Sequence, residues 1–159
     1  METKDILLFE SGDGGEMAIL NNDLELGQTL YQQVYLALFG GNLKANTRIN
    51  NLVSEELFDW WGNALFFSET PVKQFNSNTE RTLDSVSLNS SGRLTILQAV
   101  KDDLSYLSDL LNYSVDVELF GVNKIRIIVN FTQKTNQENK TLQLVYDNAK
   151  NELIIEKVI

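Results

Sequence analysis

The C-terminal part of the sequence constrains the fold most, because its apolar residues recur at every second position. Alternation of this kind is typical of strands with one buried face. Four segments carry it: 114–120, 125–131, 142–146 and 153–159. The first two are separated by Gly121-Val122-Asn123 and the last two by 147–151, both rich in turn-forming residues. Residues 114–159 therefore predict an antiparallel meander, whose last strand leaves an open edge that could pair with a partner strand.

Two segments have the 3.6-residue period of amphipathic helices. In the first, 26–39, Leu26, Leu30, Val34 and Leu38 recur every four residues before Gly40-Gly41. A glycine pair of this kind suits a helix C-terminus. In the second, 94–112, Leu97, Val100, Leu104, Leu107 and Leu111 form one apolar seam. Ser90 or Ser91 is expected to cap this helix, and Asp102, Asp103 and Asp109 to form its solvated face.

The N-terminal segment predicts a hairpin, because the apolar runs 6–9 and 17–20 flank a glycine-rich connection. Calcium binding by Glu10, Asp13 and Glu16 is a weaker interpretation, since their spacing lacks a calcium-loop signature. The polar stretch 68–92 predicts a long loop. The expected fold is therefore α+β, a single domain over 1–159, with an antiparallel sheet (C-terminal meander plus N-terminal hairpin) packed against two amphipathic helices.

Composition excludes several classes of function. The chain has no His and no Cys, which removes the usual zinc sites, Ser-His-Asp catalysis and disulfides, so neither metal nor cofactor is expected. Its net charge of -9 argues against nucleic acid and against an anionic membrane surface. With neither an apolar run of 18 residues nor a secretory signal, the sequence predicts a soluble cytoplasmic protein.

The densest aromatic stretch, 55–67, contains both tryptophans, Trp60 and Trp61. Packing in the core explains such residues most simply. In an extended chain, however, consecutive side chains point in opposite directions, which would leave one indole for a partner. Replacing each tryptophan separately would distinguish these roles.

Carboxylates beside these aromatic residues suggest one enzymatic alternative, a glycosidase acting on cell-wall polysaccharide. Such enzymes place two acids across a cleft, and aromatic rings can stack on sugars. The candidate acids are Glu55, Glu56, Asp59 and Glu69. Because 22 acidic residues produce neighbours of this kind by chance, we expect that the protein is not an enzyme.

The sequence resembles the Mu-like bacteriophage baseplate protein family, which is related to the lysozyme-like wedge component of contractile tails. The resemblance follows the order of Gly15–Leu20, Asn22-Asp23-Leu24, a helix ending in Leu38-Phe39, and Trp60-Trp61-Gly62, its most specific piece. It continues through 94–112 and 115–131. Asn63 stands where the family commonly has an acidic residue, and 75–92 is polar where the family tends to be basic.

The resemblance implies a structural subunit of a baseplate wedge, present in several symmetry-related copies and bound to other baseplate and tail proteins. It would be cytoplasmic during assembly and then part of the virion tail. The expected partner contacts are Trp60, Trp61, Gly62, Ile155 and Val158. A generic adaptor in an unrelated complex differs from this prediction only in the identity of the partner.

Overall fold

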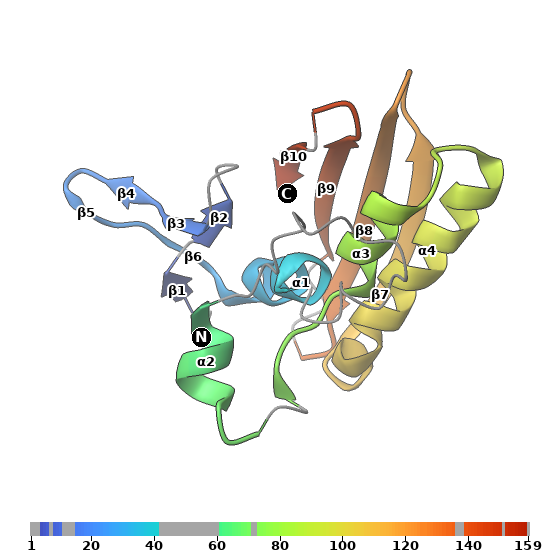
Figure 1. The fold of residues 1–159 in the computed structure, drawn as a ribbon. Coiled ribbons are helices and arrows are strands. Elements are labelled where there is room, and N and C mark those ends of the chain that lie inside the picture. The colour runs from blue at the N-terminus through green and yellow to red at the C-terminus, as the bar shows by residue number, and fades with distance from the viewer. Residues whose placement is uncertain are drawn as a thin grey trace. The chain divides into compact units, whose positions relative to one another are not determined.

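The computed structural model describes residues 4–6, 8–10, 15–41, 61–70, 73–135, 139–150 and 152–158. The backbone divides into two compact units, residues 1–77 and 78–159, which are described separately. The fold is α+β, with an N-terminal antiparallel hairpin, a C-terminal four-stranded antiparallel sheet, and helices, as the sequence predicted (Figure 1). The single domain expected from the length stays a prediction.

The second unit contains the predicted meander. Its strands are β7 (Leu111–Leu119), β8 (Lys124–Gln133), β9 (Asn139–Asp147) and β10 (Glu152–Val158). They pair antiparallel in the order β10-β9-β8-β7. The turn between β7 and β8 uses positive φ angles at Gly121 (79°) and Asn123 (57°), a conformation that glycine and asparagine adopt at low cost.

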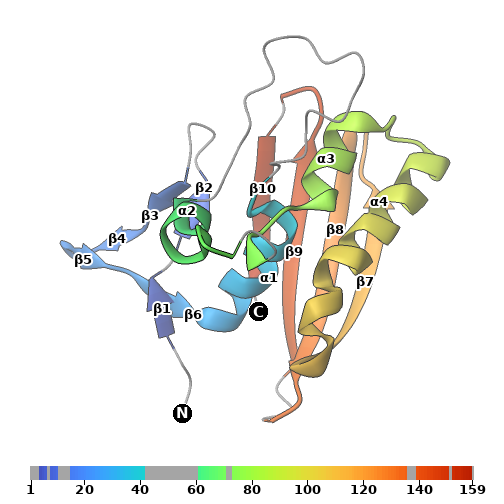
Figure 2. The same cartoon turned by 60° about the horizontal axis from the view of Figure 1, so that its bottom comes forward.

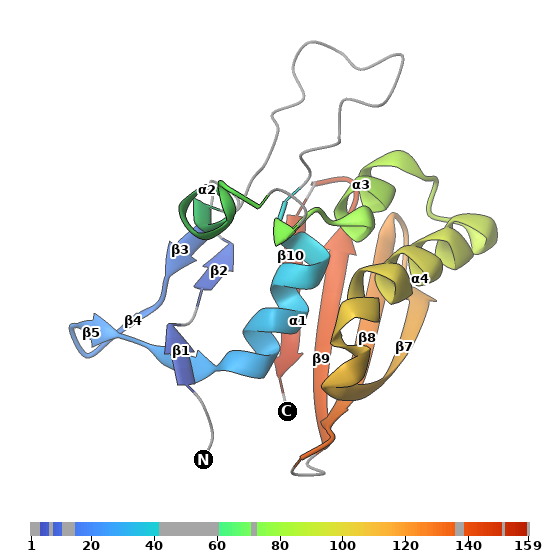
Figure 3. The same ribbon diagram turned by 90° about the horizontal axis from the view of Figure 1, so that it is seen from below.

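One face of this sheet is apolar and buried. On β8, Ile125, Ile127 and Val129 are fully buried, and on β9 so is Leu144. Helices α3 (Asn78–Ser85) and α4 (Ser90–Leu104) lie on one side of the sheet (Figure 3). Alternation along each strand thus produces the core of this unit.

Helix α4 differs from the predicted helix 94–112 at both ends. It begins at Ser90, and Asn89 rather than a serine caps it, because its Oδ1 accepts from the N–H groups of Ser91 (3.0 Å) and Gly92 (2.9 Å). It ends at Leu104 and continues as a 3-10 helix, Ser105–Asp109, before β7 begins. The buried seam nevertheless runs on through Leu107, which is why periodicity alone overestimated the length of the helix.

The long loop predicted over 68–92 is wrong for much of that range, because it contains α3 and the start of α4. Leu83 is the only buried apolar residue of α3, so the helix shows almost no apolar period. Its N-terminus is bound instead by the Asp103 carboxylate, which accepts from Asn78 N–H (2.9 Å) and Thr79 N–H (2.7 Å). Asp103 is therefore a capping residue and not part of a purely solvated face.

The first unit contains six short strands in three antiparallel pairs. They are β1 (Lys4–Ile6), β2 (Leu8–Glu10), β3 (Gly15–Met17), β4 (Ile19–Leu20), β5 (Asp23–Leu24) and β6 (Leu26–Gln28), paired as β1-β6, β2-β3 and β4-β5. The predicted N-terminal hairpin is β2-β3. Asp13, of the calcium interpretation, lies outside the described residues.

Helix α1 (Thr29–Phe39) is the shorter form of the helix predicted over 26–39. Its start is later because Leu26 belongs to β6, while Val34 and Leu38 are fully buried as expected. Gly41 follows with φ of 149°, a backbone conformation that favours glycine. At Gly40 a Cβ would lie 2.8 Å from the Cβ of Phe75, so this position leaves no room for a side chain.

Candidate interaction sites

The predicted Trp60-Trp61-Gly62 site is described only in part. Trp60 lies outside the described residues, and Trp61 and Gly62 begin α2 (Trp61–Phe67), where only their backbone is described. Because this segment is helical from Trp61 onward, the extended-chain argument for two opposite tryptophans does not apply to it. Downstream in the same helix, Leu65 and Phe66 are exposed, so part of the aromatic stretch is available to a partner.

Asn63 fixes α2 to the chain that follows it. Its side chain is fully buried, and its Nδ2 donates to the Phe75 carbonyl (3.0 Å). The Phe75 N–H in turn donates to Asn63 Oδ1 (2.9 Å). One amide side chain thus satisfies both backbone groups of Phe75, as a strand neighbour would. Sequence reasoning missed this role, because nothing near Asn63 in the chain indicates its partner.

The two edges of the C-terminal sheet differ in how their backbone groups are used. Just beyond the two ends of β7, the Phe120 N–H donates to the Lys124 carbonyl (2.8 Å), and the Leu110 carbonyl accepts from the Lys134 N–H (3.1 Å). The backbone N–H and C=O groups of the even-numbered residues of β7 therefore point toward β8. Those of the odd-numbered residues point to the free edge. At Val117 both groups are already bound: its N–H donates to Asp116 Oδ1 (2.8 Å) and its carbonyl accepts from Arg93 Nη1 (3.0 Å). The β7 edge is therefore blocked near its middle.

The β10 edge carries the predicted contacts Ile155 and Val158. The same alternation continues through β8 and β9 to β10. It makes the backbone groups of Glu152 and Ile154 point toward β9, so those of Ile155 point away from β9. The register shifts between Ile155 and Lys157, and Val158 beyond this bulge again points outward. Among the described strands, none pairs with this side of β10. The two predicted residues thus share one edge, and their backbone groups, rather than their side chains, are what the structure describes there.

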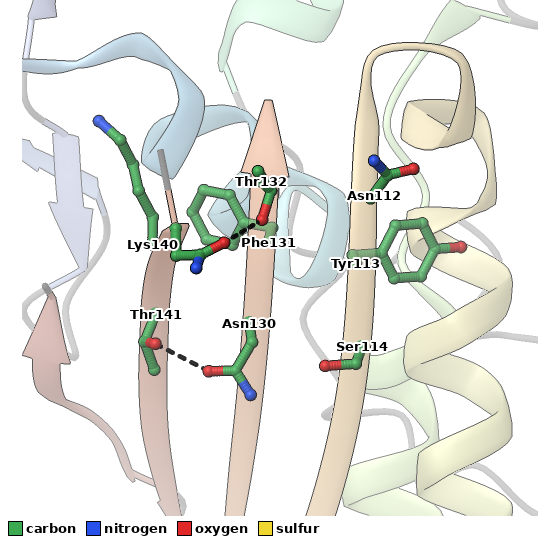
Figure 4. A pocket seen from close by; sticks show the side chains of 9 residues that line it. Asn112, Tyr113, Ser114, Asn130, Phe131, Thr132, Lys140 and Thr141 are labelled. Carbon is green, nitrogen blue, oxygen red and sulfur yellow. Dashed lines mark hydrogen bonds between the residues drawn. The ribbon is translucent and has the colours of Figure 1, made fainter. Parts of the chain in front are cut away.

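The other face of the sheet contains a shallow depression of about 440 Å³, lined mainly by polar residues (Figure 4). Two cross-strand hydrogen bonds lie in it, Thr141 Oγ1 to Asn130 Oδ1 (2.7 Å) and Thr132 Oγ1 to Asn139 Oδ1 (2.5 Å). The lining residues are Asn112, Tyr113, Ser114, Asn130, Phe131, Thr132, Asn139, Lys140 and Thr141. Amides and hydroxyls can hydrogen-bond to a partner, but this lining contains no carboxylate pair for acid-base chemistry.

Of the four carboxylates of the glycosidase alternative, the structure describes only Glu69, which does not line the depression. Glu69 is exposed just after α2, while Glu55, Glu56 and Asp59 lie outside the described residues. Across the ranges that are described, no group of three His, Cys, Asp or Glu side chains could hold a metal ion. In those same ranges, no helix is long and apolar enough to cross a membrane.

Tyr146, in the second unit, has a raised pKa and a structural role. The Tyr146 hydroxyl donates to Asp84 Oδ1 (3.1 Å) and so links β9 to α3. Burial, reinforced by the nearby Asp84 carboxylate, raises the pKa of Tyr146 well above its usual value. The hydroxyl therefore stays protonated at neutral pH and acts as a hydrogen-bond donor.

Asp147 should make the second unit less stable as the pH falls into the acid range. Lys124 Nζ lies 3.0 Å from Asp147 Oδ2, and the hydrogen bond from Lys124 lowers the pKa of Asp147. A carboxyl whose pKa is lower in the folded state stabilises the fold above its unfolded pKa, and this contribution is lost as the pH falls through the folded pKa. We expect Asp147→Asn to lower the urea midpoint modestly at pH 7, with a difference from wild type that shrinks below about pH 4.

The matched control is Asp109→Asn, at an exposed position of the 3-10 helix. It makes the same chemical change without removing an ion pair to Lys124, so it should follow wild type across the acid range. If the difference in urea midpoint between Asp147→Asn and wild type stayed the same at low pH, the ion pair of Asp147 with Lys124 would not be its cause.

Comparison with known proteins yields no relative on which to rest a function. No family model, no curated protein and no solved structure matches this chain.

Proposed function

We propose that this chain is a structural subunit that assembles by protein-protein contacts, accepting a partner strand at its β10 edge. The observation that carries the proposal is the difference between the two sheet edges. At the β7 edge, both outward backbone groups of Val117 are bound, one by Asp116 of the same strand and one by Arg93 of α4. The β10 edge pairs with no described strand.

Strand addition would give hydrogen-bond partners to backbone groups of β10 that no described strand binds. A partner strand would bond to the outward N–H and C=O groups of the edge, as in other cases of β-augmentation. At β7 the same partner would first have to displace Arg93 and Asp116 from Val117. The bound side chains thus act as protection against pairing on the wrong edge.

We further propose that the assembly is the baseplate of a contractile phage tail or a related device, with several copies of the chain contacting other tail proteins. The support is the sequence resemblance through Trp60-Trp61-Gly62 and the segments around it. The proposal requires no catalytic step, cofactor or metal. Leu65 and Phe66, exposed on α2 beside this motif, are available for a second contact.

Affinity capture of the tagged chain from cells that encode it, with mass spectrometry of the co-purifying chains, tests the proposal. Large tail or baseplate subunits are the expected result. A monodisperse monomer without partners would contradict it. Clearing of peptidoglycan by the purified protein, lost on Glu55→Gln, would instead support the glycosidase.

Substitutions at Ile155 test the strand-addition step itself. Ile155→Pro removes an outward N–H while leaving the bonds of Glu152 and Ile154 to β9, and proline is tolerated at such edge positions. We expect this variant to lose the captured subunits. Ile155→Ala loses most of the side chain but keeps the N–H, so it should retain them.

Circular dichroism and thermal unfolding of both Ile155 variants provide the folding control. If the folded proline variant captures the same subunits as the alanine variant, the partner does not bind through the backbone of β10.

A further inference from the structure

A second candidate site lies in the second unit, on the face of the sheet opposite α3 and α4. Figure 2 shows both helices in front of the strands, so this face points away from the viewer there. Triplets of the form Asn-x-Ser/Thr supply all nine residues that line its depression. They lie on three neighbouring strands: Asn112-Tyr113-Ser114 on β7, Asn130-Phe131-Thr132 on β8 and Asn139-Lys140-Thr141 on β9.

The register of the strands arranges the first and third residues of these triplets as a grid. The middle residues belong to the opposite face of the sheet, where Phe131 and Lys140 are buried. Figure 4 shows the amine of Lys140 directed away from the grid. Amides and hydroxyls alternate in both directions, with no charged side chain among them. The grid has two rows, one of Asn112, Thr132 and Asn139 and one of Ser114, Asn130 and Thr141.

Two hydrogen bonds within the grid determine which groups it offers to a ligand. The Thr141 hydroxyl donates to Asn130 Oδ1 (2.7 Å), and the Thr132 hydroxyl donates to Asn139 Oδ1 (2.5 Å). These bonds use the hydroxyl hydrogens, so the two threonine oxygens remain as acceptors and the two asparagine Nδ2 groups as donors. Each of these Asn–Thr pairs therefore presents a donor and an acceptor side by side.

Exposure to solvent does not by itself explain three asparagines at this place. Asparagine is depleted in strands, whereas threonine and the β-branched apolar residues are favoured there. Further along the same face, Asp116, Glu118 and Arg126 supply the charged side chains that solvent-exposed positions usually carry. A residue type that contradicts the local preference on three neighbouring strands is expected where a functional site requires it.

The chemistry of the grid indicates a neutral ligand with many hydroxyl groups. A phosphate would find no cation in the grid and a metal ion no carboxylate, while an apolar ligand would leave the amides unpaired. Every sugar hydroxyl both donates and accepts, and the hydroxyls surround a ring in two dimensions, whereas a peptide backbone presents its groups along one line. The volume of about 440 Å³ is within the range of roughly 300–1,000 Å³ of small-molecule sites.

We propose that this grid binds a neutral carbohydrate, which lies flat across β7, β8 and β9. The Nδ2 groups of Asn130 and Asn139 donate to sugar hydroxyls, and the oxygens of Thr132 and Thr141 accept from them. The affinity is low, with a Kd of roughly 1 mM, because the depression is shallow and the bound hydroxyls exchange one set of hydrogen bonds with water for another. The site depends neither on the β10 edge nor on the identity of any assembly.

A glycan array followed by an NMR titration of the whole chain tests the proposal. On the array, neutral oligosaccharides should bind, and their sulfated or carboxylated counterparts should bind several-fold less. The neutral oligosaccharide that binds best is then added to isotope-labelled protein up to about 10 mM, where a site with a Kd near 1 mM is about 90% occupied. The largest shifts are expected in the side-chain amide signals of Asn112, Asn130 and Asn139.

Asn130→Thr distinguishes a ligand site from a solvated face. The variant loses the central amide donor but keeps a hydroxyl, and threonine suits a strand better than asparagine. We expect its urea midpoint to equal or exceed that of wild type, while its affinity for the sugar falls about tenfold. Asn148→Thr is the matched control, at an exposed turn residue outside the lining, and its affinity should stay within about twofold of wild type.

Three results of these experiments would overturn the proposal: no shift of the three amide signals at the highest sugar concentration, a preference for anionic oligosaccharides, or equal affinities of Asn130→Thr and Asn148→Thr. Asn-x-Ser/Thr is also the acceptor triplet of N-glycosylation. Hexose-containing mass increments on these asparagines, in protein from its source cells, would mean that the face carries a covalent glycan and would overturn the proposal too. Ile155→Pro should leave sugar binding unchanged, which separates this site from strand addition.

Discussion

Asn63→Ala should lower the free energy of unfolding by about 3 kcal/mol, because it leaves two backbone groups of Phe75 without their hydrogen bonds. The Asn63 amide both donates to the Phe75 carbonyl and accepts from the Phe75 N–H. Each part-buried group that loses its partner costs about 1–3 kcal/mol. Urea denaturation followed by circular dichroism measures the loss, and hydrogen exchange at the Phe75 amide should become faster.

The matched control is Asn112→Ala, which makes the same substitution at an exposed position of β7. Exposed substitutions of this kind usually change stability by less than about 0.5 kcal/mol. Equal losses in the two variants would show that the Asn63 contacts contribute nothing beyond the general cost of removing the side chain.

Asn63→Asp replaces the buried amide by a carboxyl group of nearly the same shape. A carboxylate can accept from the Phe75 N–H but cannot donate to the Phe75 carbonyl, so the variant should be less stable than wild type at pH 7. Protonation restores a donor. The stability that Asn63→Asp loses relative to wild type should therefore shrink as the pH falls. The new carboxyl adds stability as it is protonated, whereas the Asp147 carboxyl of the wild-type protein loses its stabilising contribution.

The strands of the second unit could be predicted because each carries its own signal. Residues such as Ile125, Ile127 and Val129 alternate with polar residues, and the burial of a face follows directly from that pattern. Local signals also marked the β7–β8 turn. Helix α3 gave no such signal, since its only buried apolar residue is Leu83 and its cap, Asp103, is 25 residues away from Asn78.

The candidate sites were predictable to a smaller extent. An open C-terminal strand indicated the β10 edge, but which edge is blocked depends on Arg93, 24 residues from Val117. The β4–β5 hairpin was not predicted, although Asn21-Asn22, both at positive φ, is a recognisable turn signal. The two tryptophans were interpreted with an extended backbone, whereas Trp61 begins a helix. Local patterns therefore predicted elements, and contacts between distant residues decided which surfaces are available.

Asp103→Ala should destabilise the second unit by about 2 kcal/mol, because one carboxylate on α4 holds the N-terminus of α3. Its two oxygens accept from the N–H groups of Asn78 (2.9 Å) and Thr79 (2.7 Å), which no preceding turn of helix could bind. A negative charge at this end also interacts favourably with the helix dipole. The measurement is the urea midpoint together with hydrogen exchange along α3.

Asp102→Ala, at the neighbouring residue of the same helix, separates the cap from the general cost of removing an aspartate. The Asp102 carboxylate is exposed and accepts a hydrogen bond from Gln98 Nε2 within α4 (2.7 Å), so its loss should cost less than about 0.5 kcal/mol. Asp103→Asn keeps one acceptor and should fall between the two. Since Leu83 and the Tyr146–Asp84 bond also hold α3, loss of the cap should speed exchange at the start of α3 more than at its end. Uniform exchange along α3, or equal losses at positions 102 and 103, would contradict a cap that acts across the two helices.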